Sequence, residues 1–239
     1  MNGGAILEVD GLVKRFGGLT AVAGVSFDVP RGAVVGLIGI NGAGKTTVMN
    51  CINGIYRSDG GHVHVDGHDI THRTPHRIAA LGVGRTFQVP RVFNRMTLID
   101  NLLVPVLRSS KSDRELVAEA QGYLQRVGLA HLQSNNGEEL SGGQQKLLEL
   151  ARVMMFGPAL ILLDEPFAGV NPSLCRIMIR EIEAMRAAGT SFLLVSHDLT
   201  SIYRLSDHLL VLNQGEIIAS GGIDAVKNDP AVIEAYLGA

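Results

Sequence analysis

The chain has 239 residues, 46% of them hydrophobic and 18% charged, and its 21 Lys and Arg against 23 Asp and Glu give a formal net charge of −2. This balance argues against nucleic acid or an anionic membrane surface as a partner, because such binding usually needs clustered positive charge. The longest apolar runs, 33–40 and 153–163, are shorter than the roughly 18–20 residues that cross a bilayer. With no secretory pattern in residues 1–8, we expect a globular protein of the cytoplasm.

The first quarter of the chain predicts strands, a glycine loop and a helix. Runs of β-branched and apolar residues predict strands at 6–13, 25–29 and 34–38. Residues 44–53 have the apolar spacing of a helix, which ends before Gly54, a residue suited to a left-handed cap. Alternating residues between glycine turns then predict a small antiparallel β layer at 62–65.

The rest of the chain changes from a helical region to a parallel sheet. Apolar residues at helical spacing predict helices between 97 and 155. The solid apolar runs 160–163 and 192–195 predict strands that are covered on both faces, as in a parallel sheet. A helix predicted over 172–188 would make the crossover between them. The fold class expected from this order is α/β.

Cysteines and most histidines point to no metal site. Cys51 and Cys175 stand alone in apolar contexts, so we interpret both as packing residues rather than as half of a disulfide or ligand set. The histidines between 62 and 72 lack the spacing of metal ligands.

A phosphate-binding loop is predicted at 39–47, GINGAGKTT, which matches G-x-x-x-x-G-K-[ST] between a predicted strand and a predicted helix. Its glycines let backbone N–H groups and the positive end of the following helix point at a phosphate chain. We expect Lys45 to reach the β- and γ-phosphates and Thr46 to bind Mg²⁺. The residues expected to hold the nucleotide here are Asn41, Gly42, Ala43, Gly44, Lys45, Thr46 and Thr47.

Two acids end the predicted strand at 160–163. Asp164 is expected to hold Mg²⁺, mainly through water. Glu165 is placed to accept a proton from the water that attacks the γ-phosphate. Adjacent carboxylates would therefore have different roles.

A second glycine motif, LSGGQQK at 140–146, predicts the start of a helix capped by Ser141. Its N–H groups are free to receive an anion. Gly142 and Gly143 each cost about 1 kcal/mol inside a helix unless a close approach to the backbone requires them. We therefore expect such an approach at this point.

These motifs together resemble the ATPase subunit of ATP-binding-cassette (ABC) transporters over nearly the whole chain. The resemblance implies a P-loop NTPase core with a RecA-like parallel sheet, a small antiparallel β layer and a helical insertion. It implies one domain, in which 1–87 and 159–239 form the nucleotide-binding core lobe and 88–158 form a helical subdomain.

The resemblance also assigns residues to ATP and Mg²⁺. It implies that Phe16 stacks on adenine, that Gln88 contacts Mg²⁺ and reports the nucleotide state, and that His197 holds the γ-phosphate. The catalytic set is then Glu165, His197 and Lys45. The signature residues contact ATP bound to another subunit, which implies a dimer of identical or different chains; these residues are Ser141, Gly142, Gly143 and Gln144.

Transmembrane permease subunits are the partners that the resemblance implies, with a solute-binding protein engaged only indirectly and no nucleic acid. The chain would then lie at the cytoplasmic face of the inner membrane. Residues near Gln88 and in 90–97 mix apolar side chains with arginines, and we interpret them as a docking groove for a short cytoplasmic helix of the permease. The alternative is a loop that closes the chain's own core.

Two residues depart from the common family pattern. Ile40 stands where many relatives have proline, with little loss expected. Asn171 replaces a common aspartate, which puts coupling between the two sites in doubt but not hydrolysis. Asn171 and the stretches 15–22, 83–88 and 228–238 resemble the first ATPase subunit of branched-chain amino acid importers. Because none of these residues touches cargo, the expected substrate is inferred by association.

Three alternatives remain open at this point. Within the same fold, the ATPase of lipopolysaccharide export has a close sequence pattern. A soluble cassette ATPase of iron-sulfur assembly or translation is a second class, although translation factors of this kind usually carry two cassettes and basic surfaces. An unrelated P-loop kinase or GTPase is a third, and it would make the 140–146 motif an accident.

Overall fold

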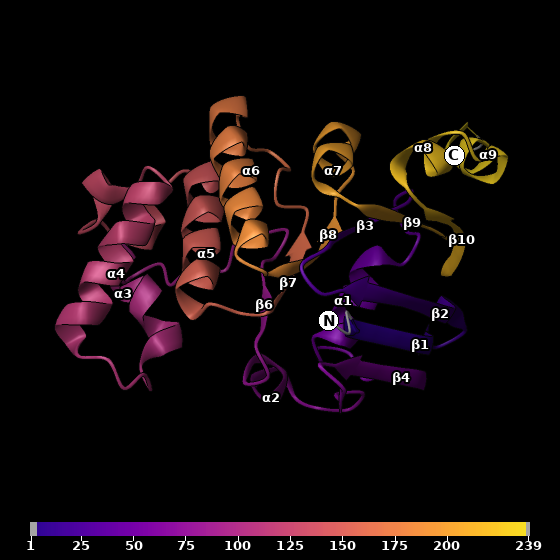
Figure 1. Ribbon diagram of the computed structural model, residues 1–239, viewed down its shortest axis with the longest axis horizontal. Helices are drawn as coiled ribbons and strands as arrows, with labels where there is room; N and C mark the ends of the chain where they lie inside the picture. The colour runs from indigo at the N-terminus through magenta and orange to yellow at the C-terminus, as the bar shows by residue number, and fades with distance from the viewer. Residues whose placement is uncertain (1–3, 238–239) are drawn as a thin grey trace.

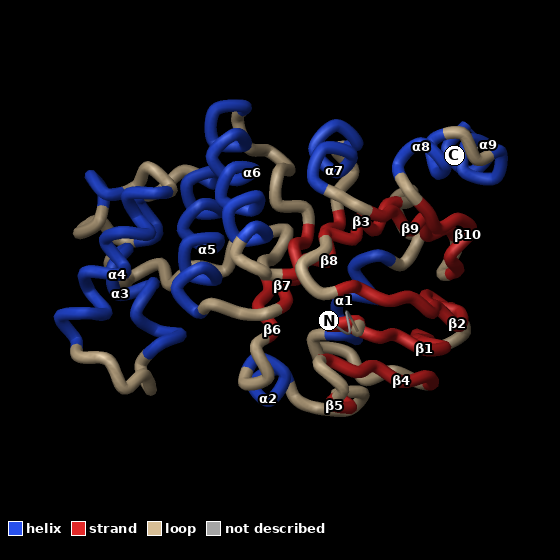
Figure 2. Tube along the Cα trace, in the orientation of Figure 1, coloured by secondary structure: helices blue, strands red, loops and turns tan. Residues whose placement is uncertain are grey.

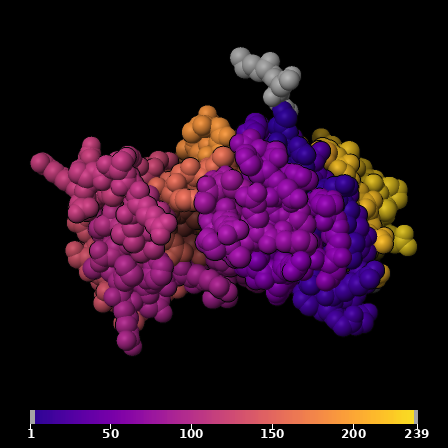
Figure 3. Space-filling model, turned by 90° about the horizontal axis from the view of Figure 1, so that it is seen from below, coloured from indigo at the N-terminus to yellow at the C-terminus, as the bar shows by residue number. Residues whose placement is uncertain are grey.

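The computed structural model describes residues 4–237, so residues 1–3 of the chain start and Gly238 of the 228–238 stretch lie outside the described residues. Within this range the strands form two sheets. Figure 2 shows the strands gathered in one half of the molecule and long helices in the other. Seen from below (Figure 3), the segment near residue 110 and the C-terminal segment occupy opposite ends of an elongated molecule.

The smaller sheet is antiparallel and has four strands in the order β2-β1-β4-β5. Its strands β1 and β2 form a hairpin longer than the two predicted strands, because pairing continues to the turn at Gly17-Gly18. The predicted β layer at 62–65 is confirmed, and it pairs with the first strand of the chain. The strands are β1 (Ala5–Phe16), β2 (Leu19–Pro30), β4 (Gly60–Val65) and β5 (His68–Asp69).

The larger sheet has six strands in the order β10-β9-β3-β8-β7-β6, and its pairs are parallel except for β10 with β9. The parallel strands predicted at 34–38, 160–163 and 192–195 are confirmed. The three other strands, at 83–85, 208–213 and 216–221, were not predicted, because they are short or have polar residues at their ends. The strands are β3 (Val34–Ile38), β6 (Val83–Arg85), β7 (Leu160–Asp164), β8 (Ser191–Val195), β9 (His208–Asn213) and β10 (Glu216–Gly221).

Helices cover the larger sheet and extend beyond one edge of it (Figure 1). The predicted crossover helix at 172–188 is α6, and it joins the parallel neighbours β7 and β8. The helical region predicted from 97 to 155 contains α3, α4 and α5. The helices are α1 (Lys45–Ile52), α2 (Pro75–Ala79), α3 (Leu98–Leu103), α4 (Asp113–Arg126), α5 (Gly142–Phe156), α6 (Pro172–Ala187), α7 (Leu199–Leu205), α8 (Ile223–Lys227) and α9 (Pro230–Leu237).

The apolar core lies on both faces of the larger sheet. Along β3, Val34 and Ile38 belong to the cluster shared with α3–α9, whereas Val35 and Leu37 belong to the cluster shared with α1 and the smaller sheet. Successive strand residues point to opposite faces, so a strand covered on both sides must be apolar throughout. This explains the solid apolar runs and places the ends of β3 and β7 at one polar edge.

Candidate functional site

The glycine loop at 39–47 lies between β3 and α1, as predicted. Gly44 precedes the helix with φ 107°, and a Cβ atom there would stand 2.4 Å from the carbonyl oxygen of Ala21. Only glycine fits both the backbone conformation and the space. The loop therefore brings its backbone close to whatever it surrounds.

Lys45 is buried and folds back over this loop. Its Nζ atom donates hydrogen bonds to the carbonyl oxygens of Gly39 at 2.7 Å and Ile40 at 2.9 Å. Burial lowers the pKa of Lys45, whereas the nearby carboxylates of Glu165 and Asp164 raise it. The ammonium group is thus held at the centre of the loop, ready for an anion.

A cavity of about 340 Å³ opens over the loop and brings together most of the predicted site residues. Glu165 and Gln88 reach it from the ends of other elements, which unites three separate parts of the sequence. The predicted residues that line it are Phe16, Asn41, Gly42, Ala43, Gly44, Lys45, Thr46, Thr47, Gln88 and Glu165.

Phe16 lies at the rim of this cavity with 44% of its surface exposed. Its ring meets Tyr56 edge-on, with centroids 5.2 Å apart, and the ammonium of Lys14 lies 5.2 Å from the ring centroid. These contacts fix an exposed aromatic face beside the glycine loop. Sequence reasoning missed the supporting ring of Tyr56, because no local pattern connects it to Phe16.

Asp164 ends β7 and is almost completely buried. Its Oδ2 atom accepts a hydrogen bond at 3.1 Å from Nη2 of Arg85, which ends the neighbouring strand β6. Burial lowers the pKa of Arg85, and the carboxylate of Asp164 opposes that shift. Arg85 was not predicted as part of the site, because the two residues are 79 positions apart.

Glu165 and His197 meet directly at the edge of the larger sheet. Oε2 of Glu165 lies 2.7 Å from Nδ1 of His197 and accepts a hydrogen bond at 3.2 Å from the His197 backbone N–H. Glu165 has φ 48°, a left-handed conformation that is costly for a residue with a side chain. Its N–H donates to the Val195 carbonyl at 2.9 Å, which helps to hold that conformation.

The signature residues begin α5 and do not line the cavity over the glycine loop, although all four are in the described part of the chain. The predicted cap is confirmed as a capping box, in which the Ser141 side chain accepts from the Gln144 N–H and the Gln144 side chain accepts from the Ser141 N–H. A Cβ atom at Gly142 would meet no described atom within 4 Å. Among the described residues, no neighbouring atom would clash with a side chain at position 142.

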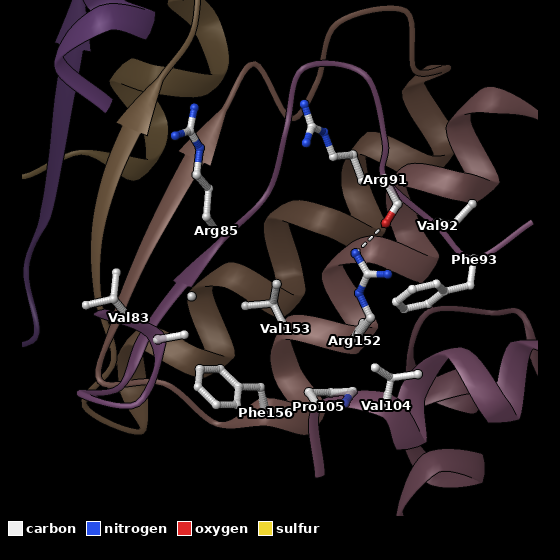
Figure 4. A pocket seen from close by; sticks show the side chains of 12 residues that line it. Val83, Arg85, Arg91, Val92, Phe93, Val104, Pro105, Arg152, Val153 and Phe156 are labelled. Carbon is white, nitrogen blue, oxygen red and sulfur yellow. Dashed lines mark hydrogen bonds between the residues drawn. The ribbon is translucent and has the colours of Figure 1, made fainter. Parts of the chain in front are cut away.

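A second cavity, of about 550 Å³, lies between β6, α5 and the segment after Gln88. Figure 4 shows apolar side chains around it together with three arginines, and the Arg152 guanidinium lies between the Phe93 ring and the Arg91 carbonyl. Nη2 of Arg152 donates a hydrogen bond to the Arg91 carbonyl at 2.5 Å. The Cζ atom of the same guanidinium lies 5.3 Å from the centroid of the Phe93 ring. The cavity is therefore apolar with a cationic edge.

Buried Asn101 on α3 organises the loop beside this cavity, and sequence reasoning missed it. Its Oδ1 atom accepts from the Phe93 N–H at 2.8 Å, and its Nδ2 atom donates to the carbonyls of Phe93, Met96 and Thr97. Because one buried amide contacts four backbone groups of the loop, it defines the path of the loop. A polar residue among apolar ones at 98–103 was the available clue.

Comparison with known proteins decides the family. A family model described as "ABC transporter" matches residues 22–168. The chain belongs to the ABC transporter family. As an ABC cassette it is an ATP hydrolase, and the α/β cassette fold inferred from the motifs is confirmed. A second model, described as "Branched-chain amino acid ATP-binding cassette transporter", matches residues 216–239.

Full-length relatives and solved cassettes agree with this assignment. The "Probable branched-chain amino acid transport ATP-binding protein LivG" of Archaeoglobus fulgidus is 41% identical over 98% of this chain and 96% of its own length. The BraF protein of Pseudomonas aeruginosa, named as a high-affinity branched-chain amino acid transport ATP-binding protein, is 41% identical over 98% of both chains. A crystal structure of an ABC cassette in its ADP conformation matches with TM-score 0.86 and 36% identity over 99% of this chain and 100% of that chain.

None of the helices in the described part of this ABC cassette is long and apolar enough to cross a membrane.

Proposed function

We propose that the chain is the ATP-hydrolysing subunit of an importer of branched-chain or related amino acids. The observation that carries this proposal is the match over 98% of the chain to proteins named for branched-chain amino acid transport. The match of residues 216–239 to the model of that name supports it independently. Both favour amino-acid import over lipopolysaccharide export and over a soluble role.

Under this proposal, ATP binds in the cavity over the glycine loop. The adenine stacks on the exposed ring of Phe16, as aromatic residues do with planar bases. The phosphates then replace the carbonyl oxygens of Gly39 and Ile40 as the hydrogen-bond acceptors of Lys45. Backbone N–H groups of 41–47 and the start of α1 complete the phosphate contacts.

The residues around Asp164 fit Mg²⁺. Its Oδ1 atom is buried and has no hydrogen-bond partner among the described residues, although Arg85 binds Oδ2. Mg²⁺ usually keeps several waters and is bound by one or two carboxylates together with phosphates. Thr46, Gln88 and Asp164 would hold it here, with Asp164 acting mainly through water. Bound Mg²⁺ would offset the charge that develops on the phosphates.

Glu165 is the proposed general base for the attacking water. Its carboxylate faces the cavity, and Oε2 is held by two groups of His197. This fixed geometry aims the remaining carboxylate oxygen at the position of the water. The imidazole of His197, 65% exposed, is free to turn its other nitrogen toward the γ-phosphate.

A second ABC subunit, identical or different, is proposed to complete the site. Ser141, Gly142, Gly143 and Gln144 lie outside the cavity over the glycine loop, and Gly142 faces open space. A helix start without side chains can approach a phosphate closely from outside. We therefore place these residues against ATP bound to the partner subunit.

The arginine-edged cavity of Figure 4 is the proposed docking groove for a cytoplasmic helix of the permease. The residues 91–93 that line this cavity come shortly after Gln88 in the chain, so a shift of the docked helix would also move Gln88, which lines the nucleotide cavity. We propose that 88–158 move as a helical subdomain against the core lobe of 1–87 and 159–239. The chain would sit at the cytoplasmic face of the inner membrane, with the solute-binding protein engaged only through the permease.

Purification of tagged Glu165→Gln protein from its own cells' membranes with MgATP tests this function. Mass spectrometry is expected to find two multi-span permeases, and the presence or absence of a second, different cassette ATPase shows whether the partner subunit is a different chain or a second copy. Loss of the gene is expected to abolish uptake of branched-chain amino acids. Recovery of soluble partners alone, or unchanged uptake, would contradict the importer.

The docking groove is tested in the same purification with Arg91→Glu. This change reverses the charge at the edge of the cavity and is expected to reduce permease recovery strongly. Arg114→Glu, an exposed arginine of α4 outside the cavity, makes the same charge change and is the matched control. Equal loss with both variants would show a general charge effect instead of docking.

A further inference from the structure

Two charged side chains of the signature helix α5 are buried against other elements. Lys146 is 7% exposed and Glu149 is 1% exposed. Buried charges are costly unless each finds specific partners. In the described structure the two residues form no ion pair with each other within 4 Å, although they lie one helical turn apart. Glu149 pairs with Arg152 at 3.8 Å instead, and the other polar contacts of both residues are with the backbone of neighbouring elements.

Lys146 holds the backbone of Glu165. Its Nζ atom donates a hydrogen bond at 2.7 Å to the Glu165 carbonyl oxygen, and this contact is fully buried. The space between α5, the end of β7 and the loop at 86–87 is a cavity of only about 10 Å³. Lys146 lines this small cavity, so its side chain has little room to move.

This contact acts on a strained residue. Glu165 has a left-handed backbone, which persists only where the surroundings over-determine it. Its N–H is held by Val195 on one side and its carbonyl by Lys146 on the other. With both flanking peptide groups held, the direction of the Cα–Cβ bond is fixed, and the contacts with His197 hold the carboxylate at the end of the side chain.

We propose that Lys146 is a positioning residue for hydrolysis, whose ammonium fixes the Glu165 carbonyl and so aims the Glu165 carboxylate into the nucleotide cavity. The inference rests on the proposed role of Glu165 as general base. Burial lowers the pKa of Lys146, and the nearby carboxylates of Glu165 and Glu149 oppose that shift. Lys146 itself touches no reacting atom.

Glu149 bonds the same helix, α5, to the loop that contains Gln88. Its two carboxylate oxygens accept from the N–H groups of Phe87 at 3.1 Å and Arg91 at 2.9 Å, one on each side of Gln88. The helix that begins with the signature residues is thereby bonded to Glu165 and to the Gln88 loop within one turn. A rotation of α5 on contact with a partner subunit would move both.

The test compares Lys146→Met with wild type. Methionine keeps the length and apolar stem of lysine but cannot donate to the carbonyl. We expect kcat for ATP hydrolysis to fall about tenfold or more, with KM for ATP within about twofold of wild type. Wild-type kcat in this variant would overturn the proposal.

A second readout separates positioning from folding. Glu165→Gln is expected to trap an ATP-bound dimer, and Lys146→Met/Glu165→Gln is expected to trap the same amount, measured by size-exclusion chromatography with MgATP. Loss of the trapped dimer would mean that Lys146 acts on binding and would overturn the proposal. Full hydrolysis by Glu165→Gln alone would instead overturn the role of Glu165.

Controls guard against a general effect of removing a buried charge. Glu181 on α6 is 3% exposed, pairs with Arg126 and Arg180, and lies outside the site, so Glu181→Gln is expected to keep wild-type kcat. Should Lys146→Met not fold, Lys146→Gln, which keeps a shorter donor, replaces it in both readouts. Failure of both to fold would overturn the proposal, because the ammonium would then serve the fold.

Discussion

Oε2 of Glu165 and Nδ1 of His197 lie 2.7 Å apart, at the ends of the adjacent parallel strands β7 and β8. The pairing register brings Asp164 opposite Val195, so both functional side chains emerge just beyond the sheet. Ligands of open α/β sheets bind at this carboxyl edge of the strands. The contact thus joins the candidate base, which lines the cavity over the glycine loop, to a histidine whose side chain is 65% exposed.

Replacement of His197 tests that contact. His197→Ala removes a donor to Glu165 and, as proposed, to the γ-phosphate, and we expect kcat to fall by about 10²–10³-fold. Steady-state hydrolysis with a fluorescent ATP-binding assay measures turnover and affinity separately. His208→Ala is the control and should hydrolyse ATP normally, because the His208 ring at the start of β9 bonds Ser220 on the neighbouring strand β10. Equal rates for both variants would exclude the role of His197.

Replacement of Arg85 tests the buried ion pair with Asp164. The Arg85 and Asp164 side chains are only 4% and 3% exposed, and removal of one partner leaves an uncompensated charge. We expect Arg85→Met to lower the free energy of unfolding by about 3–5 kcal/mol. Urea unfolding checks this against Arg186→Met, which breaks an exposed pair with Asp207 and should cost at most about 1 kcal/mol. Similar losses would contradict the buried-pair argument.

Asn171 caps α6, and its replacement separates shape from charge. Its Oδ1 atom accepts from the Leu174 N–H at 3.0 Å. We expect Asn171→Ala to cost about 1 kcal/mol of unfolding free energy, because a helix N–H loses its partner. Asn171→Asp keeps the acceptor and adds a favourable charge of about 0.3–1 kcal/mol at the helix start. Thermal unfolding measures the stability of both variants, and equal stability of Asn171→Ala and Asn171→Asp would contradict this prediction.

Cys51 offers a test that depends on pH. Burial raises the pKa of its thiol from 9.0 to about 11. A raised pKa means that the folded protein binds the proton more tightly, so this contribution to stability is complete below pH 9.0 and is lost as pH rises through about 11.

At pH 8 the folded protein should therefore hold about 100-fold less Cys51 thiolate than the unfolded chain. In a Cys175→Ser background, thiol labelling in buffer is expected to be slower than in urea by at least that factor. Comparable rates would show that Cys51 is not buried in solution.

Local patterns predicted the parts of the site that depend on neighbours in sequence. The glycine loop, its helix and the acids at the end of β7 each lie within about ten residues, where turn chemistry and strand burial determine the structure. The contact of Lys146 with Glu165, by contrast, joins residues 19 positions apart across two elements. No periodicity encodes such a contact, because it depends on how α5 packs against β7.

The extent of the first hairpin shows the same limit. The predicted strands at 6–13 and 25–29 cover most of the buried positions of the hairpin, because the pattern detects apolar core runs, but they leave out buried Val22. The backbone pairing of Arg15 with Thr20 and of Phe16 with Leu19 continues through exposed residues. That extension is what brings Phe16 to the rim of the nucleotide cavity.

The separation of the signature residues from the cavity over the glycine loop has a genetic consequence. If two copies of this chain must pair to form each site, an inactive variant mixed with wild type would also inactivate the wild-type copies with which it forms a dimer. Activity would then fall with the square of the wild-type fraction. If the partner is a different chain, activity would fall only in proportion to that fraction. A dose series of Glu165→Gln against wild type in one cell would thus count the copies of this chain in the working assembly.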